Sequence, residues 1–334
     1  MLQCRAAILR QVRAFFDNKN YLELDTPLLC DNLIPESCLE VFQTERLFPH
    51  GSRKEKQSLW LIPSPEIWMK KIIAQHKESV YQICKSFRNG ESEGRLHNSE
   101  FTMLEYYTME ADYMDSLALT EQMIEHLFKN PAPGVSAADK EKWKIEHITV
   151  AGAFEKWAGF KLLDAAYEGE EIFTSHARRL GLEPLPGMTV PQLYDLIFIH
   201  AVEPHLKIEK AIALLDYPAF VPCLARKSKD GKTVERWELY YNGIELANCF
   251  SEETDPQKIK DFFISEEEEK ERTAIVQHKV DHDYWKMFDS KTGYGFPRCS
   301  GVAMGLDRLI MALTGKSNID CVLATSNTRT EIKT

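Results

Sequence analysis

The chain has 334 residues, of which 44% are hydrophobic and 28% are charged, a composition typical of a globular protein and not of a disordered one. Lysine and arginine number 41 and aspartate and glutamate 51, so the net charge of −10 excludes a chain-wide basic surface for nucleic acid or anionic membranes. The sequence has no run of about eighteen apolar residues, no signal-peptide pattern and no C-x-x-C pair, so we expect a cytoplasmic protein with free thiols and no membrane contact.

The hydrophobic pattern predicts helices and strands without regular β-α-β alternation. Ile8, Val12 and Phe15 recur at helical spacing, and Leu22 and Leu24 alternate with acids. The expected elements, in chain order, are a helix over 1–18, a strand over 21–27, a charged loop over 49–58, a strand over 58–62, a helix from 65 to about 75, strands within 80–110, a helix over 115–129, a linker over 131–139, mostly helices over 150–215, strands over 234–250, a helix over 255–272 and a turn and helix over 301–314. This order favours an α+β fold with an antiparallel sheet flanked by helices.

The first candidate site lies in residues 86–107, where two strand-like runs flank a polar loop and predict a hairpin with a long tip. Alternation along the second run places Phe101, Met103, Glu105 and Tyr107 on one face. Acids that share a face with aromatic rings suggest a ligand site, because a buried acid without a partner is costly. These residues are also compatible with an ordinary surface hairpin.

The second candidate site is an acidic pair within residues 238–252. Glu238 and Glu245 would face opposite ways in one uninterrupted strand, but Asn242-Gly243 predicts a hairpin turn that places them on adjacent strands. Paired carboxylates suit Mg²⁺, which takes one or two protein carboxylates together with substrate phosphates. Two solvent-facing acids beside a turn are the alternative.

The third candidate site lies in residues 299–311. Gly301, Ala303 and Gly305 permit close approach of a ligand to the backbone, and Arg308 follows at the start of an apolar helix. A guanidinium beside a small-residue turn suits a polyphosphate, because its planar fork binds oxygens bidentately. The segment is neither a P-loop nor a dinucleotide-binding fingerprint. A strand-to-helix turn with a surface arginine is the alternative.

In this order, the segments resemble the motifs of class II aminoacyl-tRNA synthetases. Residues 5–29 resemble motif 1, residues 86–107 motif 2 and residues 300–313 motif 3. The strings HNSEFTMLEYY and GIELANCFSE are specifically similar to the lysyl branch, and the match spans nearly the whole chain. Lysyl-tRNA synthetases carry an anticodon-binding OB domain ahead of motif 1, for which we expect no room here. The chain therefore resembles the elongation factor P–(R)-β-lysine ligase family.

The resemblance implies a single class II catalytic domain over 1–334, without an N-terminal OB domain. It also implies a six- or seven-stranded antiparallel sheet, a mostly helical insertion over 131–233 and a homodimer formed through motif 1. The implied partners are elongation factor P and (R)-β-lysine or lysine, with no stable binding of tRNA.

The implied reaction joins ATP and a lysine-type amino acid into an aminoacyl-adenylate, and then transfers the aminoacyl group to a lysine ε-amine of elongation factor P. Mg²⁺ would be held on the triphosphate by Glu238 and Glu245. Two arginines would be catalytic, Arg88 on the α-phosphate and substrate carboxylate and Arg308 on the γ-phosphate. The other implied ATP contacts are Phe101 stacked on adenine, His97 at the phosphates, Asn98, and Glu91 in the motif 2 loop.

The implied amino-acid pocket supplies negative charge for two ammonium groups. Its acids would be Glu66, Glu105 and Glu252, and its walls Tyr107, Asn248 and Phe250. Ala303 stands where lysyl-tRNA synthetases usually carry Gly, a difference that goes with preference for β-lysine over α-lysine. Cys249 also stands where relatives usually carry Gly, a departure at the expected pocket floor.

Three other functions compete with this interpretation. One is a lysyl-tRNA synthetase-like enzyme that charges tRNA or a tRNA-like acceptor, and another is a class II asparagine synthetase, against which the acidic residues of the pocket argue. The third is a non-catalytic paralogue that senses amino acids. Retention of Arg88, Glu238, Glu245 and Arg308 argues against the sensor.

Overall fold

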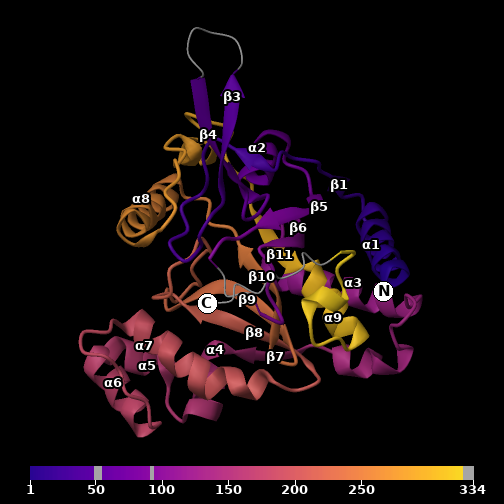
Figure 1. The fold of residues 1–334 in the computed structure, drawn as a ribbon. Helices are drawn as coiled ribbons and strands as arrows, with labels where there is room; N and C mark the ends of the chain where they lie inside the picture. The colour runs from indigo at the N-terminus through magenta and orange to yellow at the C-terminus, as the bar shows by residue number, and fades with distance from the viewer. Residues whose placement is uncertain (49–54, 91–93, 326–334) are drawn as a thin grey trace, which may run out of the picture.

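The structure is a computed structural model that describes residues 1–48, 55–90 and 94–325. Most of the predicted charged loop at 49–58 therefore lies outside the described residues. Within them, the main sheet has eight strands in the order β1-β5-β6-β11-β10-β9-β8-β7 (Figure 1). Their bounds are β1 Leu22–Glu23, β5 Val80–Phe87, β6 Glu100–Met109, β11 Cys299–Gly305, β10 Ile244–Ser251, β9 Thr233–Tyr241, β8 Ala211–Pro218 and β7 Glu146–Thr149.

The central strands of this sheet are antiparallel, as predicted, but each edge strand is parallel to its neighbour. β1 pairs with β5 and β7 pairs with β8 in the parallel sense. The expectation of a six- or seven-stranded antiparallel sheet was therefore wrong in the number of strands and in the direction of the two edge strands. β1, with 2 residues, is a shorter form of the strand predicted over 21–27, whereas β7, with 4 residues, was not predicted because it is too short for a clear alternation.

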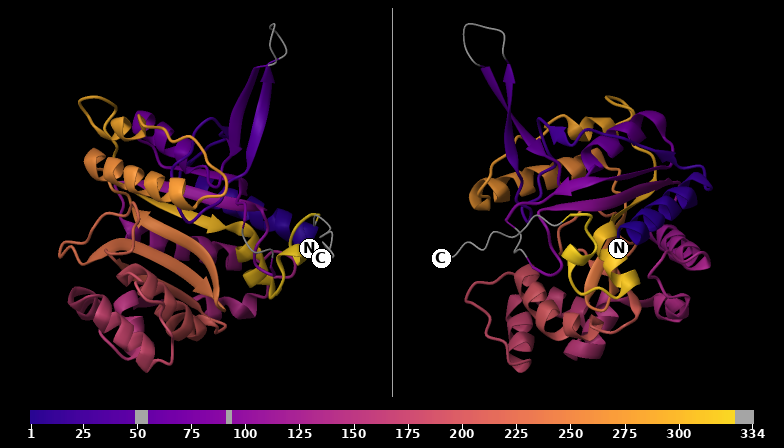
Figure 2. Two further views of the ribbon diagram at one scale, coloured as in Figure 1. Left: turned by 60° about the vertical axis from the view of Figure 1, so that its left-hand side comes forward. Right: turned by 45° about the vertical axis from the view of Figure 1, so that its right-hand side comes forward.

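A second, smaller sheet projects from the body of the molecule (Figures 1 and 2). Its order is β2-β4-β3, with bounds β2 Leu29–Cys30, β4 Glu55–Leu61 and β3 Gln43–Phe48. The predicted strand at 58–62 is the last part of β4.

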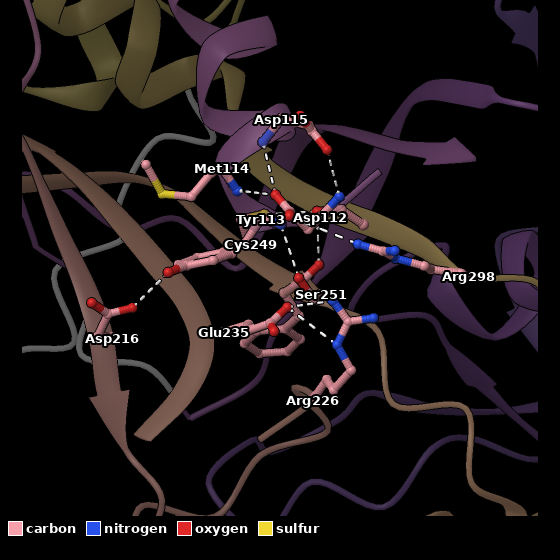
Figure 3. Close-up of polar contacts among 12 residues, drawn as sticks. Asp112, Tyr113, Met114, Asp115, Asp216, Arg226, Glu235, Cys249, Ser251 and Arg298 are labelled. Atoms are coloured by element: carbon pink, nitrogen blue, oxygen red, sulfur yellow. Dashed lines mark hydrogen bonds and ion pairs between the residues drawn. The ribbon is translucent and has the colours of Figure 1, made fainter. Parts of the chain in front are cut away.

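Buried apolar side chains and capping residues account for the positions of the helices. α1 (Leu2–Asp17) buries Ile8, Val12 and Phe16 along one stripe. α2 (Glu66–His76) starts directly after Pro65 and ends at Lys77 in the left-handed conformation. α3 (Tyr113–Lys129) starts earlier than predicted, because Asp112 and Asp115 form a capping box at its N-terminus (Figure 3). The remaining long helices, α8 (Pro256–Thr273) and α9 (Leu306–Thr314), match the predicted segments.

A helical segment over residues 150–206 packs around its own cluster of buried side chains, which includes Phe154, Phe173 and Tyr194. The predicted helical run to 215 was wrong at its end, because residues 211–215 belong to β8. The bounds of this segment are α4 Val150–Ala153, η2 Phe154–Ala158, α5 Leu162–Glu168, α6 Glu170–Arg179, α7 Val190–Ile197, η3 Phe198–Val202 and η4 Glu203–Leu206. Outside this segment, the described residues include three 3-10 helices, η1 Ala137–Trp143, η5 Tyr284–Phe288 and η6 Ile319–Cys321.

The two faces of the main sheet have different partners. Leu104, Tyr106, Trp237, Cys249 and Val302 join α1, α3 and α9 in the largest hydrophobic cluster. Their neighbours along each strand point to the opposite face, where α2, α8 and η5 form a separate cluster. That second face carries the candidate site. No helix in the described part of the chain is long and apolar enough to span a membrane.

Candidate active site

The strand register aligns the predicted site residues in two rows across the second face of the sheet. In the first row, Glu105 on β6 pairs with Ala303 on β11, Ala303 with Asn248 on β10, and Asn248 with Glu238 on β9. The second row runs in the same way, through Tyr107, Gly301, Phe250 and Arg236. Directly paired residues share a face of the sheet. Residues far apart in sequence therefore form one continuous floor.

A cleft of about 340 Å³ lies over one end of this floor. It brings together nine of the predicted residues, namely Arg88, His97, Asn98, Phe101, Glu238, Glu245, Asn248, Ala303 and Arg308. The predicted Glu91 lies outside the described residues. The other predicted residues do not line the cleft. They are Glu66, Glu105, Tyr107, Phe250 and Glu252.

The acidic pair sits on the predicted hairpin. Asn242 and Gly243 both have positive φ, 50° and 73°, as a two-residue turn of this kind requires. A register shift between Glu245 and Ala247 allows Glu245 and Asn248 to face the same side of the sheet, although they are three residues apart. The structure therefore confirms that adjacent strands carry Glu238 and Glu245.

The two carboxylates of this pair have different surroundings. Glu238 accepts hydrogen bonds from the hydroxyls of Tyr217 (2.5 Å) and Tyr240 (2.6 Å) and forms an ion pair with Arg236. Burial, and then the charge of Glu238, raise the pKa of Glu245 to about 7. A divalent cation between the two would relieve this repulsion, so the pair fits Mg²⁺ that is also held by substrate phosphates. Among the described residues, no group of three or more His, Cys, Asp or Glu side chains could hold a metal alone.

Three guanidinium groups border the cleft. The Arg88 guanidinium carbon lies 5.3 Å from the centre of the Phe101 ring. Arg308 donates to the carbonyl oxygens of Leu96 (3.2 Å) and Glu245 (3.1 Å), which fixes it beside the acidic pair. Sequence analysis missed the third, Arg236, which donates to Asn248 Oδ1 at 3.2 Å and lies over the ring of Phe250. Its spacing of two residues from Glu238, on the same strand, was a usable signal.

The remaining acids form a cluster outside the cleft lining, in which Glu105 and Glu252 are buried and Glu66 is partly exposed. Glu105 accepts hydrogen bonds from Ser64 Oγ (2.9 Å) and Tyr107 Oη (2.7 Å). Burial, followed by the charge of Glu66, raises the pKa of Glu105 to about 8. Burial likewise raises the pKa of Glu252 to about 7, although its ion pair with Lys70 opposes the shift. The predicted acids are therefore together, and Lys70 lies among them.

Gly301 provides the space for this acidic cluster. A Cβ atom at this position would lie 2.5 Å from Glu252 Oε1 and 2.5 Å from Tyr107 Cε1, closer than non-bonded atoms approach. The value of this glycine is therefore its lack of a side chain. Unlike the turn glycines, it does not adopt positive φ.

Sequence analysis also missed two acids beside the cleft. Glu36 lines it, and burial followed by the nearby charge of Glu66 raises the pKa of Glu36 to about 7. Asp307 is buried and accepts a hydrogen bond from Thr102 N at 2.7 Å, next to Phe101. No helical or strand periodicity distinguishes Glu36, because it lies in an irregular segment.

Cys249 does not lie in the pocket floor, contrary to expectation. It pairs with Trp237 and Val302 and faces the opposite side of the sheet, where its sulfur lies 3.2 Å from Ser300 Oγ. Figure 3 shows it beside the start of α3, where Tyr113 N donates to Ser251 Oγ at 2.8 Å. The Cys249 side chain therefore belongs to the hydrophobic cluster that contains α3 and does not line the cleft.

Comparison with known proteins identifies the family. The model of the family "tRNA synthetases class II (D, K and N)" matches residues 1–329. The chain is 32% identical over 327 residues to the elongation factor P–(R)-β-lysine ligase of Avibacterium paragallinarum, covering 97% of this chain and 94% of that protein. It is 34% identical to the ligase of the same name from Buchnera aphidicola (Schizaphis graminum), with coverages of 97% and 95%.

A third relative of that name, from Vibrio atlanticus, is 33% identical over 329 residues, with 97% of this chain and 94% of the relative covered. The match to the family model agrees with the α+β fold described above. The chain belongs to the class II tRNA synthetase family and, within it, to the elongation factor P–(R)-β-lysine ligases.

Proposed function

We propose that this ligase activates (R)-β-lysine or lysine as an aminoacyl-adenylate and transfers it to a lysine of elongation factor P. The observation that carries the proposal is the row Glu105–Ala303–Asn248–Glu238. It joins the acidic cluster, suited to ammonium groups, to an acidic pair suited to a metal-bound triphosphate. An amino-acid carboxylate lying between the two would face the α-phosphate.

The ATP end of the cleft would hold the nucleotide through cations and one aromatic ring. Phe101 would stack on adenine, with His97, Asn98 and Glu91 as further contacts. Arg308, already fixed beside the acidic pair, would grip the γ-phosphate, and Glu238 and Glu245 would hold Mg²⁺. When bound, Mg²⁺ would neutralise charge on the phosphates.

Arg88 would act at the centre of the reaction. Its charge opposes the rise in pKa of both Glu36, which is near Glu66, and Glu245, so its guanidinium is close to both acids. From there it would hold the substrate carboxylate against the α-phosphate and stabilise the charge that develops during in-line attack. Positioning and electrostatics would supply most of the catalysis, without a covalent enzyme intermediate.

The amino-acid end would select a substrate with two ammonium groups. Glu66, Glu105 and Glu252 would receive them, and Tyr107, Asn248 and Phe250 would form the walls. An apolar side chain would leave the excess negative charge of this cluster unneutralised, because Lys70 supplies only one positive charge for three carboxylates, which is a basis for discrimination. Ala303 pairs directly with Glu105 and Asn248, where its methyl group would favour β-lysine over α-lysine.

Residues 1–334 would form one catalytic domain, with a helical insertion within 131–233 and a homodimer built through residues 5–29. Elongation factor P would be the acceptor, and no stable binding of tRNA is expected. Lysine-dependent exchange of pyrophosphate into ATP tests the activation step. Exchange with (R)-β-lysine, with lysine or with both is the expected result. The absence of exchange with both amino acids would contradict adenylate formation.

A further inference from the structure

Lys70 is a buried cation for which the proposed reaction gives no role. It lies on α2, one helical turn after Glu66, and its side chain is 2% exposed. Its ammonium lies 2.6 Å from Glu66 Oε1 and 2.7 Å from Glu252 Oε2. Burial alone would lower the pKa of Lys70, but Glu252 and Glu66 hold it well above its ordinary value. Lys70 is therefore a fixed positive charge inside the acidic end of the site.

The surroundings of Lys70 come from every element packed around it. The groups that face this cluster are Glu66 on α2, Glu105 and Tyr107 on β6, Glu252 after β10, Tyr284 on η5 and Cys299 on β11, while Glu36 faces Glu66. The carboxylates of Glu105 and Glu252, which are buried, and of Glu66, which is 24% exposed, thus accompany one ammonium, so the fully ionised cluster carries two unbalanced negative charges. A diamino acid brings two ammonium groups, which is the matching charge.

We propose that Lys70 is a positioning residue for amino-acid recognition, which orients the Glu66 and Glu252 carboxylates and sets the charge of the cluster to match two substrate ammonium groups. The inference rests on the proposed function of this end as a diamino-acid pocket. Without Lys70, the three carboxylates would repel one another more strongly, and Glu105 and Glu252, whose pKa values burial already raises, would take up protons more readily. A protonated carboxyl would accept an ammonium poorly until a higher pH removed the proton.

Calorimetric titration with L-lysine between pH 6.5 and 9 tests this role in four proteins: wild type, Lys70→Met, Lys70→Arg and Lys71→Met. Lys70→Met is expected to bind lysine about tenfold more weakly at pH 7, with the loss shrinking as the pH rises. Its affinity for ATP should stay within about threefold of wild type. Lys70→Arg keeps the charge and should follow the pH profile of wild type.

Lys71→Met is the matched control. Lys71 is the next residue of the same helix, and its ammonium lies 2.7 Å from Asp281, outside the cluster. Its substitution should leave lysine affinity and its pH dependence unchanged. A loss in Lys70→Met that is equal at every pH, or that is shared equally by ATP, would reduce Lys70 to a structural support and overturn the inference.

The double variant Lys70→Met/Glu252→Gln separates charge from folding. It removes one charge of each sign, so the fully ionised cluster of Glu66 and Glu105 keeps the two unbalanced negative charges of wild type. The pH dependence of its lysine affinity should return toward that of wild type, even if the affinity itself is lower. If lysine affinity in the double variant still recovers only at high pH, as in Lys70→Met, the inference would be overturned. A wild-type protein that binds lysine in this way but transfers none to elongation factor P would contradict only the proposed function.

Discussion

Arg5 in the first helix and Asp307 in the last long helix are joined by an ion pair of 2.5 Å, with side chains 12% and 2% exposed. Arg5 also donates to Thr102 Oγ1 at 2.7 Å, while the second oxygen of Asp307 accepts the backbone N–H of Thr102. The three residues tie the N-terminal helix to the strand that carries Phe101 and to the helix that carries Arg308. The geometry of the ATP end therefore depends on a contact between the two ends of the sequence.

Replacing Arg5 by Met should lower the free energy of unfolding by about 3 kcal/mol, because it leaves the Asp307 carboxylate buried without its partner. Urea unfolding followed by circular dichroism measures this loss. Arg13→Met is the control, since Arg13 forms an ion pair with Glu23 in which both side chains are 40% exposed. Such a pair contributes about 1 kcal/mol or less. Equal effects of the two substitutions would contradict the structural role of Arg5.

Gly301→Ala should weaken binding of lysine at the cluster of Glu66, Glu105 and Glu252. The added Cβ would collide with Glu252 and Tyr107, so the KM for lysine in pyrophosphate exchange should rise by about tenfold or more. Gly305→Ala is the comparison, because the nearest atom to its Cβ would be Arg308 Cδ at an ordinary 3.7 Å. It should leave the KM for lysine within about threefold of wild type. A larger effect at Gly305 than at Gly301 would contradict the assignment of the two ends.

Ala303→Gly should raise the activation of α-lysine relative to (R)-β-lysine by about tenfold, because the methyl group lies between Glu105 and Asn248 and would set the position of the substrate amino group. Pyrophosphate exchange with each isomer gives the ratio of kcat/KM values. An unchanged ratio would show that the selectivity lies elsewhere in the pocket.

The buried carboxyl of Glu105 should make stability fall as pH rises. Its pKa is raised to about 8 in the folded protein and is about 4.3 when unfolded, so the folded state binds more protons between these values. Its contribution to the free energy of unfolding therefore decreases from about pH 4.5 to pH 8. The difference between the urea midpoints of wild type and Glu105→Gln, measured at pH 5, 6.5 and 8, reports this contribution of Glu105. The urea midpoint of wild type should fall relative to that of Glu105→Gln as the pH rises. A rise of the wild-type midpoint relative to the variant would contradict the assignment.

The same carboxyl predicts proton release on ligand binding. A substrate ammonium beside Glu105 would lower its pKa toward the ordinary range, so lysine affinity should increase as pH rises from 6.5 to 8. Calorimetry in two buffers of different ionisation enthalpy counts the protons. Uptake of protons, or none exchanged, would contradict a direct contact between the ammonium and this carboxyl.

The parts of the fold that the sequence predicted are those with local signals. Asn242-Gly243 determines the hairpin that places the acidic pair on neighbouring strands, and the hydrophobic stripe of α1 is visible as a helical period. A strand was predicted over 21–27, where β1 lies, but its parallel pairing with β5 was not, and β7 was missed, because pairing depends on distant strands and not on the few residues of the edge strand.

The candidate site was likewise predictable only where its residues lie in recognisable sequence motifs. Motif resemblance located the acids and arginines, and the strand register explains why they share one face. Lys70 and Arg236 had local signals, at helical and strand spacing from a predicted acid. Glu36 and the contact of Arg5 with Asp307 had none, because they arise from an irregular segment and from residues 302 positions apart in the chain.

The central claim is that this ligase modifies elongation factor P with a lysine-type amino acid. The intact mass of the matching elongation factor P, after incubation with the protein, ATP and either L-lysine or (R)-β-lysine, tests it most directly, with bulk tRNA present as a competing acceptor. The account predicts a mass increase of one lysyl residue on elongation factor P, greatest with (R)-β-lysine. An unmodified elongation factor P together with charged tRNA would contradict it.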